Sequence, residues 1–285
     1  MRGKYSYVVC LACAVLTGLF AFGPQAEERE PGLAARQDVV FSCAFESPGW
    51  YREWGLTEPP KTADTVAEDP GLKFEPFQGK ALRARIDKGG NNGLNLLFPF
   101  KKRTGSEPEE IYFRYYLRFA DDWLPEEQGG KLPGISGTYG RAGWGGRPVN
   151  GRDGWSARGS FGRIMGGKTP VGFYCYHADM KTKYGDIWVW KNDDLGYLPN
   201  NRWYCVEQHL KLNTPGQNDG VMHAWIDGKL AFEKTDVRFR DVSDLKIENI
   251  WLNVYQGGTK PAKAEQHLYI DNVVIARNYI GPAAK

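Results

Sequence analysis

Apolar and polar residues alternate along many short stretches of this chain, and no stretch of useful length shows the 3.6-residue apolar period of a helix. The alternation is clearest at 111–119, where the sequence is IYFRYYLRF. Strands are also predicted at 39–45, 81–86, 94–98, 154–158, 171–177, 186–191, 203–213, 220–226, 230–234, 247–255 and 267–277. The dipeptide Asp227-Gly228 lies between two apolar runs, which is typical of a tight β-hairpin. The pattern therefore predicts an all-β protein.

The composition favours one large sandwich of two antiparallel sheets. The chain has 285 residues with 10 Trp, 15 Tyr and 14 Phe, and aromatic residues favour strands. Its 35 Gly and 17 Pro follow no collagen-like period and indicate many turns. We predict a single β-jelly-roll domain over 38–285. One sheet would offer a concave groove to a linear polymer, lined by every second residue of each strand.

The segment 129–167 is rich in glycine and is predicted to consist mainly of long loops that alternate with short strands. The overlapping stretch 131–170 carries seven basic residues and only one acidic residue, Asp153. The formal charge of the whole chain is only +3, so this segment is a basic patch on an otherwise acidic body. Such a patch concentrates an anionic ligand.

The first 26 residues have the pattern of an export signal. Arg2 and Lys4 precede a nearly apolar run over 8–23, and Ala26 ends the signal before the acidic Glu27. The apolar run is short for a membrane span, and no later segment resembles one. We therefore expect cleavage after Ala26, a linker at 27–37, and a secreted or periplasmic protein without stable membrane insertion. A lipid anchor is an alternative.

Three cysteines follow the leader: Cys43, Cys175 and Cys205. An exported protein can form disulfides, and Cys175–Cys205 is one candidate pair. Buried unpaired thiols are the alternative. No Cys/His spacing predicts a metal site.

Two segments each place a polar pair on one face of a strand, because residues two apart point the same way. These pairs are Ser156 with Arg158 and Tyr174 with Tyr176. Together with Lys131, they suit the removal of a weakly acidic proton beside a carboxylate. An arginine can neutralise the carboxylate, and lysine or tyrosine can transfer protons if its pKa falls. A nearby guanidinium is expected to lower the pKa of both.

A set of spaced motifs resembles polysaccharide lyase family 14, which includes alginate lyases from molluscs and an algal virus. The motifs are GGKLPG (129–134), GWGG (143–146), GWSAR (154–158), YCYH (174–177), EQH (207–209) and NTPGQNDG (213–220). The resemblance covers 112–282. It implies a concanavalin-like jelly roll that acts by endo-type β-elimination without a metal; no cofactor is expected. The polymer could be alginate-like or glucuronan-like, because a related family acts on glucuronan.

The resemblance also implies roles for individual residues. The family's catalytic lysine falls on Lys131, and its Ser-x-Arg pair falls on Ser156 and Arg158. Its Tyr-x-Tyr pair falls on Tyr174 and Tyr176. We expect Lys131 and Tyr176 to transfer protons, with base and acid unassigned. Arg158 and Ser156 would hold the carboxylate, and Tyr174 would support the sugar.

Each of these residues also has a simpler structural interpretation. Lys131 could be a solvated loop lysine. The tyrosines could be half-buried sheet residues, and Ser156 with Arg158 could fix a loop.

Further contacts with the anionic polysaccharide are predicted at five positions. They are Gln208 and His209 in the EQH motif, and Arg141, Trp144 and Arg147 in the basic segment. Gln208 and His209 could instead be plain surface residues, and Trp144 could belong to the sandwich core.

The sequence also bears on three other functional classes. A lectin-like β-sandwich that binds acidic polysaccharides is the main alternative, although a binder has no need for a proton-transfer pair. A glycoside hydrolase requires two facing carboxylic acids, which the site segments lack. Nucleic-acid binding is disfavoured in an exported chain that is nearly neutral once the leader is removed. We expect a monomer.

Overall fold

The computed structural model describes residues 30, 32–33 and 35–283, and they form a sandwich of two antiparallel sheets. The strands of the first sheet are β1 (Val39–Cys43), β2 (Ala63–Val66), β3 (Ala81–Ile86), β5 (Glu110–Phe119), β11 (Tyr204–Lys211), β12 (Gly220–Ile226), β13 (Lys229–Val237) and β15 (Gln266–Ala276). They lie in the order β13-β12-β11-β5-β15-β3-β2, and β1 pairs with β15. The all-β jelly-roll prediction is confirmed.

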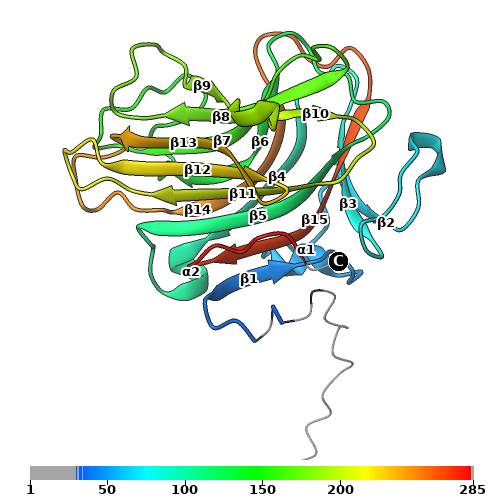
Figure 1. Cartoon of the computed structure of the whole chain (residues 1–285), viewed down its shortest axis with the longest axis horizontal. Coiled ribbons are helices and arrows are strands. Elements are labelled where there is room, and N and C mark those ends of the chain that lie inside the picture. Colours follow the sequence, from blue (N-terminus) through cyan, green and yellow to red (C-terminus); the bar gives the residue numbers. More distant parts are fainter. Residues whose placement is uncertain (1–29, 31, 34, 284–285) are drawn as a thin grey trace, which may run out of the picture.

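The second sheet carries the glycine-rich segment. Its strands are β4 (Asn92–Pro99), β6 (Gly130–Gly137), β7 (Trp155–Phe161), β8 (Lys168–Tyr176), β9 (Asp186–Val189), β10 (Tyr197–Pro199) and β14 (Asn249–Gln256). Their order is β10-β8-β7-β6-β14-β4, and β9 pairs with β8. The helices α1 (Trp50–Glu53) and α2 (Phe100–Thr104) are short, and 3₁₀ turns lie at Pro70–Leu72 and Asn192–Asp194. Figure 1 shows α1 and α2 near β1 and β15.

The core fills the space between the two sheets. β5 buries Ile111, Phe113, Tyr115 and Leu117 on its inner face, and neighbouring strands contribute in the same alternating manner. Full burial of a large apolar side chain contributes about 1.5–3 kcal/mol. The alternation that predicted the strands is therefore the pattern that holds the sheets together.

The hairpin predicted at Asp227-Gly228 joins β12 to β13. Asp227 has φ 51° and Gly228 has φ 78°, so both central residues adopt the left-handed conformation. A two-residue turn of this kind matches the twist of the strands that it connects.

The prediction of mainly loops over 129–167 was wrong at Gly130–Gly137, which forms β6 in the middle of the second sheet. Glycine is required there by close packing, because a Cβ at Gly134 would lie 2.5 Å from the carbonyl oxygen of Ala157. Pro133 lies where the pairing register of β6 with β7 shifts, a position that proline tolerates. β2 and β10 were also not predicted.

The candidate disulfide between Cys175 and Cys205 is absent from the structure, in which both thiols, like that of Cys43, are buried and free. Cys175 faces the core from β8, whereas Cys205 lies on the outer face of β11 beside Tyr116. The two side chains therefore belong to different faces of different sheets and cannot meet.

The predicted export signal at 1–26 lies outside the described residues. Part of the predicted linker is described and contacts the domain, since the Glu30 carboxylate pairs with the fully buried guanidinium of Arg114. Within the part of the chain that the structure describes, no helix has the length and apolar character needed to span a membrane.

Candidate active site

Five of the predicted site residues lie on the outer face of the second sheet. Ser156 and Arg158 of β7 stand directly opposite Tyr176 and Tyr174 of β8. Their neighbours Ala157 and Cys175 point into the core. Lys131 of β6 projects to the same outer face, because the next residue, Leu132, belongs to the core. The structure therefore brings together all five residues from three adjacent strands.

The aromatic ring of Tyr174 is the centre of this cluster. The ammonium nitrogen of Lys131 lies 4.2 Å from the ring centroid, and the guanidinium carbon of Arg158 lies 5.8 Å from it. The ring of Tyr176 meets that of Tyr174 edge-on at 5.6 Å. Two cations and a second phenol thus converge on Tyr174.

The neighbouring strand β14 completes the cluster with three residues that sequence reasoning missed. Trp251 packs under Arg158, with 4.6 Å between the guanidinium carbon and the ring centroid. Asn253 accepts a 3.4 Å hydrogen bond from Arg158, and Tyr255 lies 5.7 Å from the Lys131 nitrogen. Their two-residue spacing was a visible signal. The contact between β14 and β6, which are distant in sequence, was not.

Arg158 is a buried guanidinium with few partners. Its side chain is 6% exposed, its Nε has no hydrogen-bond partner among the described residues, and its bond to Asn253 is long. Burial lowers its pKa to about 10, although the phenols of Tyr176, Tyr174 and Tyr255 favour the charged form. A buried cation with an unused donor is a ready site for a carboxylate, which can accept two parallel hydrogen bonds.

Lys131 is poised for proton transfer. Burial, together with the positive charge of Arg158, lowers the pKa of its amine to about 8. Both causes disfavour the charged ammonium, as expected for a lysine in a partly dry site near another cation. A fraction of the neutral amine is therefore present near neutral pH, which a solvated lysine does not provide.

For Tyr174 the predicted direction of the pKa shift was wrong. Burial raises the pKa of this phenol well above its usual range, and the hydroxyl of Tyr176 adds to the rise. The attraction of Arg158 for a phenolate acts in the opposite direction but is smaller. Tyr174 therefore stays a neutral phenol, which suits support rather than proton abstraction.

A loop over 138–154 covers Tyr176 and Ser156. The backbone N–H of Gly146 donates a 3.1 Å hydrogen bond to the Tyr176 hydroxyl, and the Ser156 hydroxyl donates to the Gly143 carbonyl at 2.6 Å. Both glycines belong to the GWGG motif. Ala142 and Val149 of the same loop pack against the two tyrosines. The motif therefore fixes the surroundings of Tyr176.

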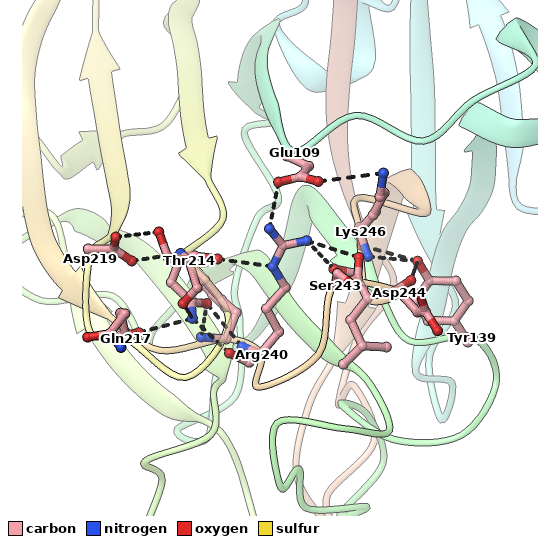
Figure 2. Close-up of polar contacts among 12 residues, drawn as sticks. Glu109, Tyr139, Thr214, Gln217, Asp219, Arg240, Ser243, Asp244 and Lys246 are labelled. Atoms are coloured by element: carbon pink, nitrogen blue, oxygen red, sulfur yellow. Dashed lines mark hydrogen bonds and ion pairs between the residues drawn. The ribbon is translucent and has the colours of Figure 1, made fainter.

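Polar contacts anchor both ends of this loop. At its start, the Tyr139 hydroxyl donates to Glu107 at 2.7 Å. The same hydroxyl accepts the backbone N–H of Lys246 at 2.9 Å (Figure 2). Near its end, the Gly151 carbonyl accepts the backbone N–H of Asp241 at 2.7 Å. The segment 238–248 thus supports the loop at both ends.

Arg240 stabilises the supporting segment 238–248 through hydrogen bonds to backbone carbonyls. It is 2% exposed and donates to the carbonyls of Asn213, Ser243 and Leu245. Its guanidinium also pairs with Glu109 at 2.6 Å (Figure 2). Asn213 begins the NTPGQNDG motif, so this motif contributes to the support of the loop.

Three of the predicted polymer contacts lie in the same loop. Arg147 lies over the indole of Trp144 with 3.9 Å between the guanidinium carbon and the ring centroid. Arg141 lies over the ring of Tyr139 at 5.2 Å. Both arginines are exposed, and Trp144 is half-buried. They are therefore available at the surface of the loop, next to the cluster of five.

The structure does not bring Gln208 to this face. Gln208 belongs to β11 of the other sheet, is fully buried, and donates a 2.8 Å hydrogen bond to the Pro133 carbonyl of β6. It thus crosses the core to the strand that carries Lys131. In this position Gln208 supports β6 and cannot touch a polymer on the outer face.

His209 also lies away from the cluster, on the outer face of the first sheet. Its ring stacks on Tyr112 at 4.2 Å and shares hydrogen bonds with Glu110 and His223. Burial lowers the pKa of its imidazole. The EQH motif therefore places Gln208 in the core and His209 on the outer face of the first sheet, away from the candidate active site.

The comparisons with known proteins agree with this fold. A family model described as Polysaccharide lyase 14 matches residues 78–273. No curated protein shows a significant sequence match to the chain.

Solved structures similar to this chain include three lyases. Alginate lyase Aly36B is 20% identical, with a TM-score of 0.63, covering 85% of this chain and 98% of its own. The marine PL-14 alginate lyase from Aplysia kurodai is 17% identical, with a TM-score of 0.63, covering 84% and 99%. Endo-β-1,4-glucuronan lyase from the fungus Trichoderma reesei is 16% identical, with a TM-score of 0.54, covering 84% and 96%.

Proposed function

Since the chain belongs to polysaccharide lyase family 14, we propose that it cleaves a 4-linked uronic-acid polymer by β-elimination on the outer face of the second sheet. The products would carry a C4–C5 double bond at the new non-reducing end. Both alginate-like and glucuronan-like polymers fit this chemistry, and the similar structures include lyases of each kind.

One observation carries the proposal: a buried, under-satisfied Arg158 guanidinium next to a lysine whose pKa is lowered to about 8. A lectin-like site would need only the guanidinium. Elimination also needs a base for the C5 proton, and the neutral amine of Lys131 is such a base. The combination therefore favours a lyase over a binder.

The carboxylate of the reacting uronate would bind Arg158. Nε is buried out of reach of a ligand, but among the described residues the Nη atoms are engaged only through the long bond from Nη1 to Asn253, so they can donate to a carboxylate. This contact neutralises the carboxylate and stabilises the enolate-like charge that develops when C5 loses its proton. No metal is needed in this scheme, because the guanidinium of Arg158 supplies the positive charge that the carboxylate needs.

The neutral amine of Lys131 would take the C5 proton and become an ammonium. The electron pair of the broken C–H bond forms the C4–C5 double bond, and the bond from C4 to O4 breaks. The hydroxyl of Tyr176 would donate a proton to the departing O4. Proton exchange with solvent then restores both residues.

Tyr174 and Ser156 would act as supports. The ring of Tyr174 separates Lys131 from Tyr176, so it fixes the spacing between base and acid. Ser156 already donates its hydroxyl proton to Gly143, so it holds the loop above Tyr176. Arg141, Trp144 and Arg147 would contact neighbouring sugars from the loop.

Export to the periplasm or the medium is part of the proposal, because the N-terminal 26 residues have the pattern of a signal peptide. N-terminal sequencing of the protein recovered from its producing cells tests this. A mature chain beginning at Glu27 is expected, and an intact Met1 would contradict export.

Mass spectrometry of the products tests the reaction class. Elimination yields oligomers that are lighter by one water than the hydrolysis products of the same polymer. Unsaturated oligomers are expected. Products that are all saturated and of the hydrolytic mass, with no unsaturated oligomer, would contradict the proposal.

A further inference from the structure

A pocket lies on the outer face of the first sheet, on the opposite side of the sandwich from the candidate active site. The proposed reaction does not use this pocket. It has a volume of about 610 Å³ and is formed by five parts of the chain that are distant in sequence. Its floor is Tyr116 of β5, which pairs with Cys205 of β11 on the outer face of the first sheet. The volume is in the range of small-molecule sites.

The walls of this back pocket are aromatic. The ring of Phe77 stacks on Tyr116 with 4.0 Å between centroids, and Trp203 stands at 61° to Phe77 at 6.2 Å. The indole N–H of Trp203 donates to the Glu75 carbonyl at 2.7 Å, and the Tyr116 hydroxyl accepts the backbone N–H of Ala283 at 2.8 Å. The polar atoms of both rings are engaged, so the rings are fixed in orientation.

The rim of the back pocket carries a charged pair. Arg202 donates from Nη2 to Asp227 at 2.8 Å, and its side chain is 64% exposed. The other oxygen of Asp227 accepts the backbone N–H of Cys205 at 2.9 Å. Asp227 is therefore fixed by the sheet, and it pairs with one nitrogen of Arg202. The guanidinium carbon of Arg202 also lies 4.8 Å from the ring centroid of Tyr204.

We propose that the back pocket is a second, non-catalytic binding site for one residue of an acidic polysaccharide. The apolar face of the sugar ring would lie against Phe77 and Trp203, and the carboxylate would bind Arg202. Rigid aromatic walls with a guanidinium at the rim fit this class of ligand, because the sugar offers both an apolar face and an anion. The choice of an acidic polymer rests on the proposed function.

Such a site would let one molecule hold a second polymer strand while the first strand is cleaved. The two sites lie on opposite faces, so a single short oligomer cannot fill both. Binding at the back pocket would raise the effective concentration of the enzyme in a polymer gel.

Calorimetric titration of the full chain with a uronate trisaccharide tests the proposal. The Lys131→Ala protein serves as host so that the ligand survives. Two sites per chain are expected in the host. In the Arg202→Gln variant of that host one site is expected to weaken by about tenfold or more. Exposed Arg277, replaced by Gln, is the matched control and should keep both sites.

A neutral trisaccharide is the chemical control. Its affinity should be the same in the Arg202→Gln variant and in the host, because it has no carboxylate for Arg202 to bind. Trp203 also packs against Phe74 and Tyr269, so Phe77→Ala is the second test of the aromatic wall. One site per chain in the host, or equal affinities in the Arg202→Gln and host proteins, would overturn the inference. These outcomes do not depend on whether the polymer is cleaved, so the two proposals fail separately.

Discussion

The ammonium nitrogen of Lys131 lies 4.2 Å from the ring centroid of Tyr174, on the strand two places away in the same sheet. The intervening strand supplies Arg158, whose guanidinium lies over the same ring. This stack holds two cations close together without a carboxylate between them, which is costly unless a substrate anion fills the gap.

The rate constant kcat/KM is expected to rise as the pH increases through about 8, the pKa of Lys131. The reason is that only the neutral amine can accept the C5 proton. A pH profile measured at limiting substrate checks this. A rate that falls over the same interval would assign Lys131 as the acid instead.

Replacing Lys131 with Met is expected to abolish cleavage and to stabilise the fold at pH 7 by about 1–3 kcal/mol. The pKa of Lys131 is about 8 in the folded protein and 10.5 as a model value, so folding disfavours its charged form. Between these values the unfolded chain binds more protons, and the free energy of unfolding rises with pH. Denaturation at several pH values should show this rise in the native protein and its absence in the variant.

Replacing Arg158 with Lys is expected to lower kcat/KM by roughly 10²–10³. The charge remains, but the planar fork that fits a carboxylate is lost. Steady-state kinetics checks this, with Arg277→Lys at an exposed position as control. Equal losses in both variants would point to a general charge effect rather than a specific contact.

Replacing Gly146 with Ala is expected to reduce kcat by about tenfold or more, whereas Gly145→Ala should have little effect on turnover. Both residues have positive φ, so both substitutions introduce similar backbone strain. Only Gly146 donates to Tyr176, and only there would a Cβ meet Tyr184 and Lys183. If turnover falls equally in both variants, strain rather than the contact to Tyr176 is responsible.

Treatment with a chelator is expected to leave the rate of cleavage unchanged, because the guanidinium of Arg158 supplies the positive charge that the carboxylate needs. Dialysis against the chelator, followed by the standard assay, checks this. Loss of activity that returns on addition of a divalent cation would contradict the scheme.

The sequence predicted which side chains share a face of the sheet where both members of a pair lie on one strand. The two-residue spacing placed Ser156 with Arg158 and Tyr174 with Tyr176 on shared faces, as the structure has them. Trp251 was missed because β14 pairs with β6 across a large separation in sequence, and alternation within a strand does not reveal its neighbours.

Other misses have different physical causes. Gly130–Gly137 contains one β-branched residue, Ile135, and no aromatic residue, and its glycines are set by close backbone packing. Gln208 and His209 are adjacent in a strand, so they must point to opposite faces. Whether either face of this strand lies near the candidate active site depends on the order of strands in the sheets. The motif alone does not reveal that order.

Ultraviolet absorbance during incubation with a panel of uronate polymers tests β-elimination most directly, with the Lys131→Ala protein as control. We predict an absorbance increase from the C4–C5 double bond on at least one polymer, and no increase in the control. A flat trace on every polymer, with binding still detectable, would contradict the lyase account and favour a lectin-like protein.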